Sequence, residues 1–173
     1  AVRGGLDEAM NALHAHRLQV FLRKNDLDKA LPVVYNEYIA SGGDADERSV
    51  REQIPYAQNM GAECFVLDSG WYASKGTGDA RSEWWLTVGD WEAPAARWPQ
   101  GLEETARLIR QRGMIPGIWL EPECVGRLSK AFDDPDLPLM RVGGRPVEDD
   151  NRRFLNFADP RARERMDGVI GRL

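Results

Sequence analysis

The sequence predicts an α/β fold, namely a partial (β/α)8 TIM barrel that holds the first three β/α units after a lead-in helix. A helical segment, a glycine and a buried strand that ends in an acid follow one another twice, as in parallel βαβ crossovers. Three parallel strands alone would leave sheet edges unpaired. A complete barrel usually needs about 250 residues, and this chain has 173. We therefore expect part of a longer barrel.

Residues 1–32 are expected to form the lead-in helix and a linker, and residues 33–173 the barrel part. Apolar residues recur at helical spacing between residues 6 and 23, namely Leu6, Met10, Leu13, Leu18 and Phe21. The first ten residues have neither the apolar core nor the cleavage pattern of a signal peptide. We expect a cut inside a longer chain and a cytoplasmic location.

The first β/α unit is expected to begin with a short strand at residues 33–38, which is rich in Val and Tyr. A helix through residues 48–60 follows, with Asp44 or Asp46 as its N-cap. Gly61 is then the left-handed residue that ends the helix. This order of strand, helix and glycine is the first half of a parallel crossover.

The second and third strands follow the same pattern. The residues AECFVLD predict a buried strand that ends in Asp68. A helix is expected at residues 101–112, with two glutamates in its first turn and Gly113 at its end. The residues MIPGIWLEPE then predict the third strand.

The remainder of the chain is expected to be less regular. Several Pro and Gly residues after Glu123 predict loops or a small hairpin. Residues 153–157 are a candidate short strand. Asp159 as N-cap and Pro160 at the first helical position open a last helix that runs to Leu173. A fourth parallel strand is expected after that helix.

Composition limits the classes of function. The chain has 42% hydrophobic residues, and its 23 basic and 28 acidic residues give a net charge of −5. Because no run of like charge forms a basic patch, we expect no nucleic acid partner. The longest apolar stretches are well below the roughly 20 residues of a membrane span, so no membrane segment is expected. Cys64 and Cys124 lie in or beside apolar runs and are expected to be buried thiols.

The candidate functional residues are those that close the strands, because active sites of (β/α) barrels lie at the carboxyl ends of the strands. They are Asn36, Glu37 and Tyr38 after the first strand, Asp68, Trp71 and Tyr72 after the second, and Trp119, Glu121 and Glu123 after the third. Aromatic rings stack on the C–H faces of a sugar, and carboxylates accept hydrogen bonds from its hydroxyls. The pattern therefore favours a saccharide ligand.

The long connection at residues 73–99 contains four tryptophans, Trp84, Trp85, Trp91 and Trp98. It is far longer than a usual βα loop of two to six residues. We expect it to form a wall over a pocket, with Trp91 facing the pocket. At least two of the four are expected to form a small core of their own.

The motifs YNEY, FVLDSGWY and GDWEAPAARWPQGLEETARLIRQRGMIPGIWLEPE resemble family 36 of the glycoside hydrolases, the bacterial α-galactosidase group of the melibiase clan. The resemblance covers roughly residues 33–173. It implies a retaining mechanism with two aspartates, a nucleophile at the end of strand four and an acid/base at the end of strand six. Both are expected after Leu173, so no catalytic residue is expected in this chain.

The resemblance also implies binding roles. Asp68 would accept hydrogen bonds from sugar hydroxyls, Trp119 would form part of the sugar-facing wall, and Tyr38 stands where the family usually has Trp. An arginine that reaches the sugar would be Arg152 or Arg153, of which we take Arg153. The full set expected to bind substrate is Tyr38, Asp68, Ser69, Trp71, Trp91, Trp119, Glu121 and Arg153.

One residue departs from the family pattern. The family's α-galactosidases place two adjacent aspartates after strand two to hold O4 and O6 of galactose, and here Asp68 is followed by Ser69. A hydroxyl is a weaker acceptor than a carboxylate, by about 1 kcal/mol or more per bond. The resemblance therefore implies a glycosidase for α-linked galactose or a related sugar.

Two alternatives remain open for the acids. Since adjacent strands lie about 4.8 Å apart, Asp68 and Glu121 could approach the roughly 5 Å separation of a retaining catalytic pair. Glu121 and Glu123 could instead cap loop amides or pair with Arg127.

Two alternatives also remain for function. The chain could be a non-catalytic carbohydrate-binding or assembly module. A barrel enzyme that uses a phosphate or a metal is less favoured, since no glycine-rich phosphate loop and no His cluster is present. Hydrolysis by two carboxylates requires no cofactor, and none is expected. The expected partners are an α-galactoside or related saccharide and the rest of the barrel, with a homo-oligomer left open.

Overall fold

The computed structural model of the protein describes residues 3–20, 26, 30–73 and 80–173, with only the backbone described at residues 80–83. The chain divides into two compact units, Ala1–Pro32 and Val33–Leu173. The first unit contains helix α1 (Leu6–Val20), whose residues are all exposed. The expected extension of this helix toward residue 23 lies outside the described residues.

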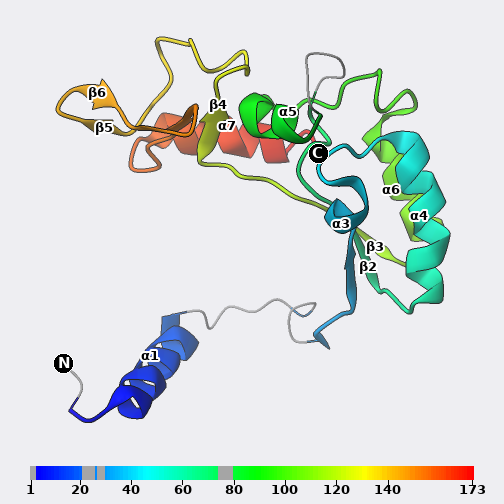
Figure 1. Cartoon of the computed structure of the whole chain (residues 1–173), viewed down its shortest axis with the longest axis horizontal. Helices are drawn as coiled ribbons and strands as arrows, with labels where there is room; N and C mark the ends of the chain where they lie inside the picture. Colours follow the sequence, from blue (N-terminus) through cyan, green and yellow to red (C-terminus); the bar gives the residue numbers. More distant parts are fainter. Residues whose placement is uncertain (1–2, 21–25, 27–29, 74–79) are drawn as a thin grey trace. The chain divides into compact units, whose positions relative to one another are not determined.

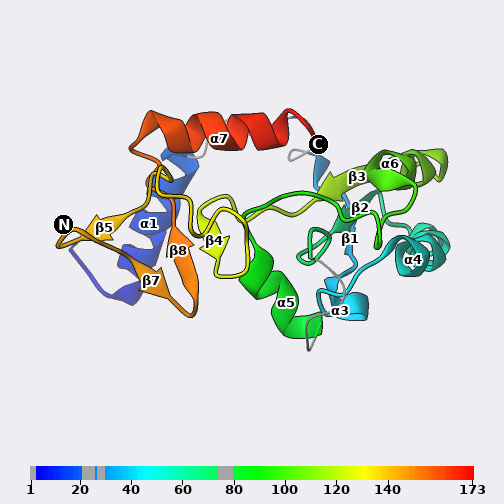
Figure 2. The same cartoon turned by 90° about the horizontal axis from the view of Figure 1, so that it is seen from above.

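The second unit is built on a parallel sheet of three strands in the order β1 (Val34–Asn36), β2 (Cys64–Leu67) and β3 (Ile115–Ile118). Val34 pairs with Cys64, and Cys64 pairs with Ile115. Helices α4 (Glu47–Asn59) and α6 (Gly101–Gln111) lie side by side against the sheet (Figures 1 and 2). The predicted parallel strands and the two helices between them are confirmed.

Two shorter helices lie in the connections that precede α4 and α6. Helix α3 (Tyr38–Ser41) follows β1 directly, so Tyr38 begins a helix and does not extend the strand. Helix α5 (Ala80–Thr87) lies within the long connection after β2 and contacts β4. The connection therefore has a helix of its own, which the sequence analysis did not predict.

The start of α4 is fixed by a capping box. The Asp46 carboxylate accepts the backbone N–H of Ser49 at 2.8 Å, and the Ser49 hydroxyl accepts the backbone N–H of Asp46 at 3.1 Å. The N-cap is therefore Asp46, one of the two expected residues. Along this helix Val50, Ile54 and Ala57 are buried and pack toward the sheet.

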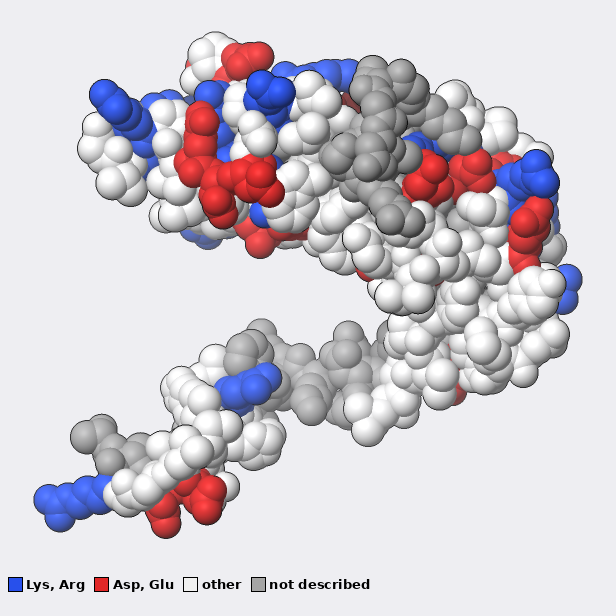
Figure 3. Space-filling view, in the orientation of Figure 1, with Lys and Arg blue, Asp and Glu red and all other residues white. Residues whose placement is uncertain are grey.

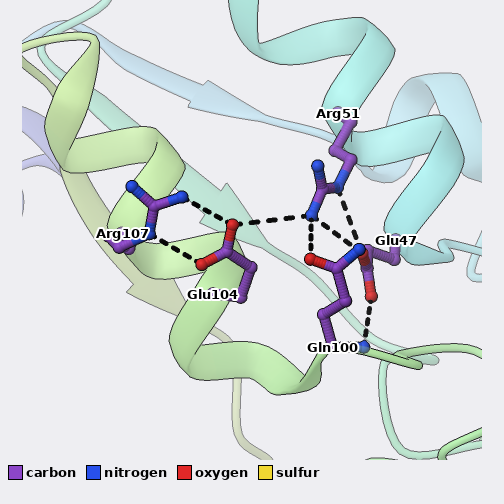
Figure 4. Close-up of polar contacts among 5 residues, drawn as sticks. All are labelled: Glu47, Arg51, Gln100, Glu104 and Arg107. Atoms are coloured by element: carbon purple, nitrogen blue, oxygen red, sulfur yellow. Dashed lines mark hydrogen bonds and ion pairs between the residues drawn. The ribbon is translucent and has the colours of Figure 1, made fainter.

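A polar network joins α4 to α6 (Figure 4). Glu47 accepts hydrogen bonds from Arg51 within its own helix and from the backbone N–H of Gln100, which precedes α6. Arg51 also donates to the Gln100 side chain and lies 3.7 Å from Glu104. Glu104 is held in turn by Arg107. Because Glu47 is buried, its two partners keep a buried charge satisfied.

A second sheet follows β3, where the sequence predicted loops or a small hairpin and one short strand. It is antiparallel, in the order β4 (Cys124–Gly126), β8 (Arg152–Phe154) and β7 (Glu148–Asp149). Strands β5 (Arg141–Val142) and β6 (Arg145–Pro146) form the expected small hairpin. The predicted strand at residues 153–157 is found as β8, which begins one residue earlier and ends at Phe154, and it pairs with β4 in antiparallel fashion.

The last helix, α7 (Pro160–Ile170), begins as predicted, with Asp159 as N-cap and Pro160 in its first turn. Its buried residues Ala162, Met166 and Val169 bridge two apolar clusters. Ala162 packs in the smaller cluster, with Val125 and Leu155, and the other two pack in the cluster beside the parallel sheet. Helix α7 thus joins the two sheets into one unit.

The surface of this unit carries both signs of charge. On the face shown in Figure 3, Lys and Arg side chains lie interspersed with Asp and Glu. In the part of the chain that the structure describes, no helix has the length and apolar character to cross a membrane.

Candidate functional site

The carboxyl ends of β1 and β2 meet at Asp68. Because the strands are parallel and neighbouring, Asn36 at the end of β1 reaches the residue that follows β2. Its side-chain amide donates to Asp68 Oδ2 at 2.6 Å, and the Ser69 backbone N–H donates to Asp68 Oδ1 at 2.7 Å. Both carboxylate oxygens are thus oriented, while the side chain remains partly exposed. Each oxygen keeps a lone pair for a further donor.

Glu37 is the second acid at this edge, and it is fully buried. Its Oε1 accepts the backbone N–H of Asp68 at 3.0 Å. Burial raises the pKa of Glu37, and the hydrogen bond from the Asp68 amide offsets part of that rise. The sequence analysis placed Glu37 at the strand end but omitted it from the binding set. No sequence signal marked it as buried.

Two glycines allow the loops at this edge to touch. Gly70 has φ +94° and Gly43 has φ +86°, both in the region that favours glycine. A Cβ on Gly70 would collide with the Gly43 carbonyl, and a Cβ on Gly43 would collide with the Trp84 ring. The turn after β2 therefore packs on the loop after α3, and that loop packs on helix α5.

A group of partly buried aromatic rings extends from this edge. Tyr38 and Trp84 pack edge to face with ring centroids 6.3 Å apart, and Trp84 packs edge to face with Trp119 at 6.0 Å. Trp119 also lies 6.5 Å from the buried ring of Tyr72. The structure therefore brings the predicted residues Tyr38, Asp68 and Trp119 to one side of the parallel sheet.

Trp71 and Trp91, two other predicted binding residues, lie in the core. Trp71 is fully buried and donates its indole N–H to the Trp119 carbonyl at 2.9 Å. Trp91 is 3% exposed and packs against Trp71 and Tyr72. Trp98 is buried as well and donates to the Trp71 carbonyl. Trp91 is therefore largely a packing residue, because burial of its large apolar surface is favourable.

Ser69 also differs from its predicted orientation. The residue is 2% exposed, and its hydroxyl is buried without a hydrogen bond to any residue that the structure describes. Its backbone N–H, by contrast, supports the Asp68 carboxylate. Ser69 thus acts on Asp68 through its main chain.

Glu121 pairs with Arg152, and not with Arg127 as one alternative expected. Nη1 of Arg152 donates to both Glu121 oxygens, at 2.8 and 2.9 Å. The Arg152 guanidinium also lies over the Trp85 ring, 3.3 Å from its centroid. These contacts tie the segment after β3 to β8 and to α5.

Arg153, the arginine taken for the sugar, lies on the opposite face of β8. Its guanidinium pairs with Glu148 at 2.8 Å, donates to the Phe132 carbonyl and stacks on the Phe132 ring. Successive residues of a strand point to opposite faces, so only one of two adjacent arginines can face Glu121. The structure gives that place to Arg152.

A cavity of about 800 Å3 runs along the β3 side of the sheet. It is lined by residues of β3, α6 and the chain after α7, with Trp91 as the one predicted binding residue in its wall. Leu67, which precedes Asp68, also lines this cavity, whereas Asp68, Tyr38 and Trp119 do not. Among the described residues, no three His, Cys, Asp or Glu side chains are grouped as a metal site.

Comparison with known proteins agrees with the strand-end pattern: the melibiase family model matches residues 2–173. The chain belongs to the melibiase family. Alpha-galactosidase 1 of Pediococcus pentosaceus is 28% identical over 151 residues, which are 87% of this chain and 20% of the relative. Alpha-galactosidase Mel36A of Lactobacillus acidophilus is 27% identical over 163 residues, 94% of this chain and 21% of the relative.

Solved structures of the family share the fold. The GH36 α-galactosidase AgaA of Geobacillus stearothermophilus has a TM-score of 0.69 at 25% identity, over 82% of this chain and 19% of AgaA. The α-galactosidase of Lactobacillus brevis has a TM-score of 0.68 at 26% identity, over 82% of this chain and 18% of that protein. These relatives have a TIM barrel, and this melibiase-family chain spans about a fifth of their length.

Proposed function

We propose that this melibiase-family chain is part of a retaining glycoside hydrolase for α-linked galactose or a related sugar. The observation that carries the proposal is the oriented, partly exposed Asp68 carboxylate at the same edge of the parallel sheet as Tyr38 and Trp119, whose rings both contact Trp84. A carboxylate that can still accept hydrogen bonds suits sugar hydroxyls, and aromatic rings suit C–H faces. The α-galactosidase relatives support the same substrate class.

In this proposal the chain supplies sugar-binding residues, and the catalytic carboxylates belong to later strands of the barrel. Asp68 accepts hydrogen bonds on both oxygens, from Asn36 and the Ser69 amide. Glu121 accepts on both oxygens from Arg152. A carboxylate whose two oxygens both accept hydrogen bonds from the protein is better suited to binding and orienting a substrate than to nucleophilic attack. This argument favours later strands over the alternative in which Asp68 and Glu121 form the catalytic pair.

Choice of sugar would depend on Asp68, since the Ser69 hydroxyl is turned inward. A single carboxylate at this turn makes fewer charge-assisted bonds to the substrate than two would. We therefore expect the ratio of kcat/KM for galactosides to that for related α-linked sugars to be smaller than two carboxylates would give.

The test uses the full-length natural protein and a panel of aryl α-glycosides. We expect hydrolysis of aryl α-galactosides with retention of configuration, and a loss of about a hundredfold or more in kcat/KM for Asp68→Ala, which removes charged hydrogen bonds. Asp159→Asn, at the start of α7, is the control and is expected to leave kcat/KM unchanged. Saturable sugar binding without hydrolysis would instead indicate a binding module. Turnover by residues 1–173 alone would place the catalytic pair within this chain.

A further inference from the structure

Glu37 is set apart from the other acids at the strand ends by its surroundings. It is 0% exposed, whereas Asp68 and Glu121 are partly exposed. A buried carboxylate is costly unless its oxygens have donors. The Oε1 atom has such a donor, the backbone N–H of Asp68, the residue proposed to bind sugar, whereas the buried Oε2 atom has none among the residues that the structure describes.

Glu37 and Asn36 hold Asp68 from two sides. Asn36 is the last residue of β1 and Glu37 is the N-cap of α3, and here the first reaches the Asp68 side chain while the second reaches the Asp68 main chain. The Glu37 backbone N–H also donates to Val66 at 3.2 Å, which continues the ladder between β1 and β2. The place of Asp68 is therefore determined by the end of β1.

We propose that Glu37 is a positioning residue for substrate binding: through its bond to the Asp68 amide, it sets where the Asp68 carboxylate meets the sugar. This inference rests on the proposed function of Asp68. Glu37 itself touches no substrate, because it has no exposed surface. For this role Glu37 must supply a side-chain oxygen that reaches the Asp68 backbone N–H. The negative charge of the carboxylate is not required.

Three substitutions separate the acceptor from the charge. Glu37→Gln keeps a side-chain oxygen at the same reach and removes the charge. Glu37→Asp keeps the charge and withdraws the oxygen by one methylene. Glu37→Ala removes both. Loss of a hydrogen bond that holds a binding group is expected to raise KM for an aryl α-galactoside about tenfold, equal to about 1.4 kcal/mol.

The matched control is Glu47, another buried glutamate that accepts a backbone N–H, that of Gln100 at 2.8 Å. Glu47 belongs to the network between α4 and α6 (Figure 4), and the partners of its side chain there, Arg51 and Gln100, are not candidate site residues. Glu47→Ala is expected to lower the melting temperature at least as much as Glu37→Ala. It is expected to leave KM unchanged.

The experiment measures KM and kcat of the full-length protein, together with deuterium exchange of the Asp68 amide. We expect Glu37→Asp and Glu37→Ala to raise KM about tenfold and to speed exchange, and Glu37→Gln to stay within about threefold of the wild type. Equal KM values for Glu37→Asp and the wild type would overturn the inference, as would a Glu37→Gln variant as weak as Glu37→Asp. If the wild type itself fails to cleave α-galactosides, the proposed function fails. The exchange data would then still report whether Glu37 holds the Asp68 amide.

Discussion

Arg152 offers the most direct test of how the segment after β3 is held. Its side chain is almost fully buried and donates to both oxygens of Glu121 while it stacks on Trp85. Arg152→Ala removes a charge-assisted pair, worth about 2 kcal/mol when partly buried, and a cation–π contact, worth about 1 kcal/mol. It also leaves Glu121 without its cation. We therefore expect the free energy of unfolding to fall by about 3 kcal/mol.

The neighbouring residue supplies the control. Arg153→Ala removes the same side chain from the opposite face of β8, where its partner Glu148 is half exposed. Exposed pairs contribute about 0 to 1 kcal/mol, and the bond to the Phe132 carbonyl and the more exposed stacking on the Phe132 ring each add about 0.5 kcal/mol, so we expect a loss of about 1 to 2 kcal/mol. Urea denaturation of both variants measures the difference.

A double-mutant cycle with Glu121→Gln isolates the pair. We expect a coupling energy of about 1 to 2 kcal/mol between Arg152 and Glu121. The reasoning is refuted if Arg152→Ala costs no more than Arg153→Ala, or if the coupling is below about 0.5 kcal/mol.

Three further predictions follow from single contacts. Asp46→Ala removes the α4 capping box and is expected to lower the free energy of unfolding by about 1 kcal/mol. Thermal denaturation measures this loss, and an unchanged melting temperature would contradict it. Burial raises the pKa of Glu37 in the folded chain, so the stability that its protonated form contributes is complete below the unfolded pKa and is lost as pH rises through the folded pKa. Glu37→Gln should flatten that slope in urea titrations at several pH values, and parallel curves would count against it. Burial, with a hydrogen bond to Glu121, raises the pKa of Cys124 to about 12. In the native state at pH 8, alkylation of Cys124 by iodoacetamide should therefore be about a thousandfold slower than that of an exposed thiol. Labelling as fast as that of an exposed thiol would refute this.

The parallel sheet and its helices were predictable because each signal is local. The capping residues Asp46 and Asp159 and the apolar strand that ends at Asp68 lie next to the elements they define. Parallel order then brings Asp68 and Trp119 to one edge without any knowledge of side-chain contacts. The sequence therefore predicted which strand ends meet.

The second sheet was missed because its strands are two or three residues long and pair across distant positions. Cys124 pairs with Phe154, so no hydrophobic period within a window reveals the match. For the same reason Arg152 and Arg153 could not be distinguished, since only the register of β8 decides which one faces Glu121. The burial of Trp91 depends on packing among rings that lie far apart in the sequence.

The glycine contacts around Gly43 have a consequence for how the loops of this fold can be exchanged. Barrel enzymes usually acquire new specificity by exchanging one loop at a time, because each loop is anchored on its own strand. Here the main chain at Gly70 rests on the carbonyl of Gly43, and Gly43 rests on Trp84. A new loop introduced after α3 alone would no longer fit the turn after β2 or the Trp84 ring of α5. A change of specificity would therefore require replacing the loop after α3, the turn after β2 and helix α5 together.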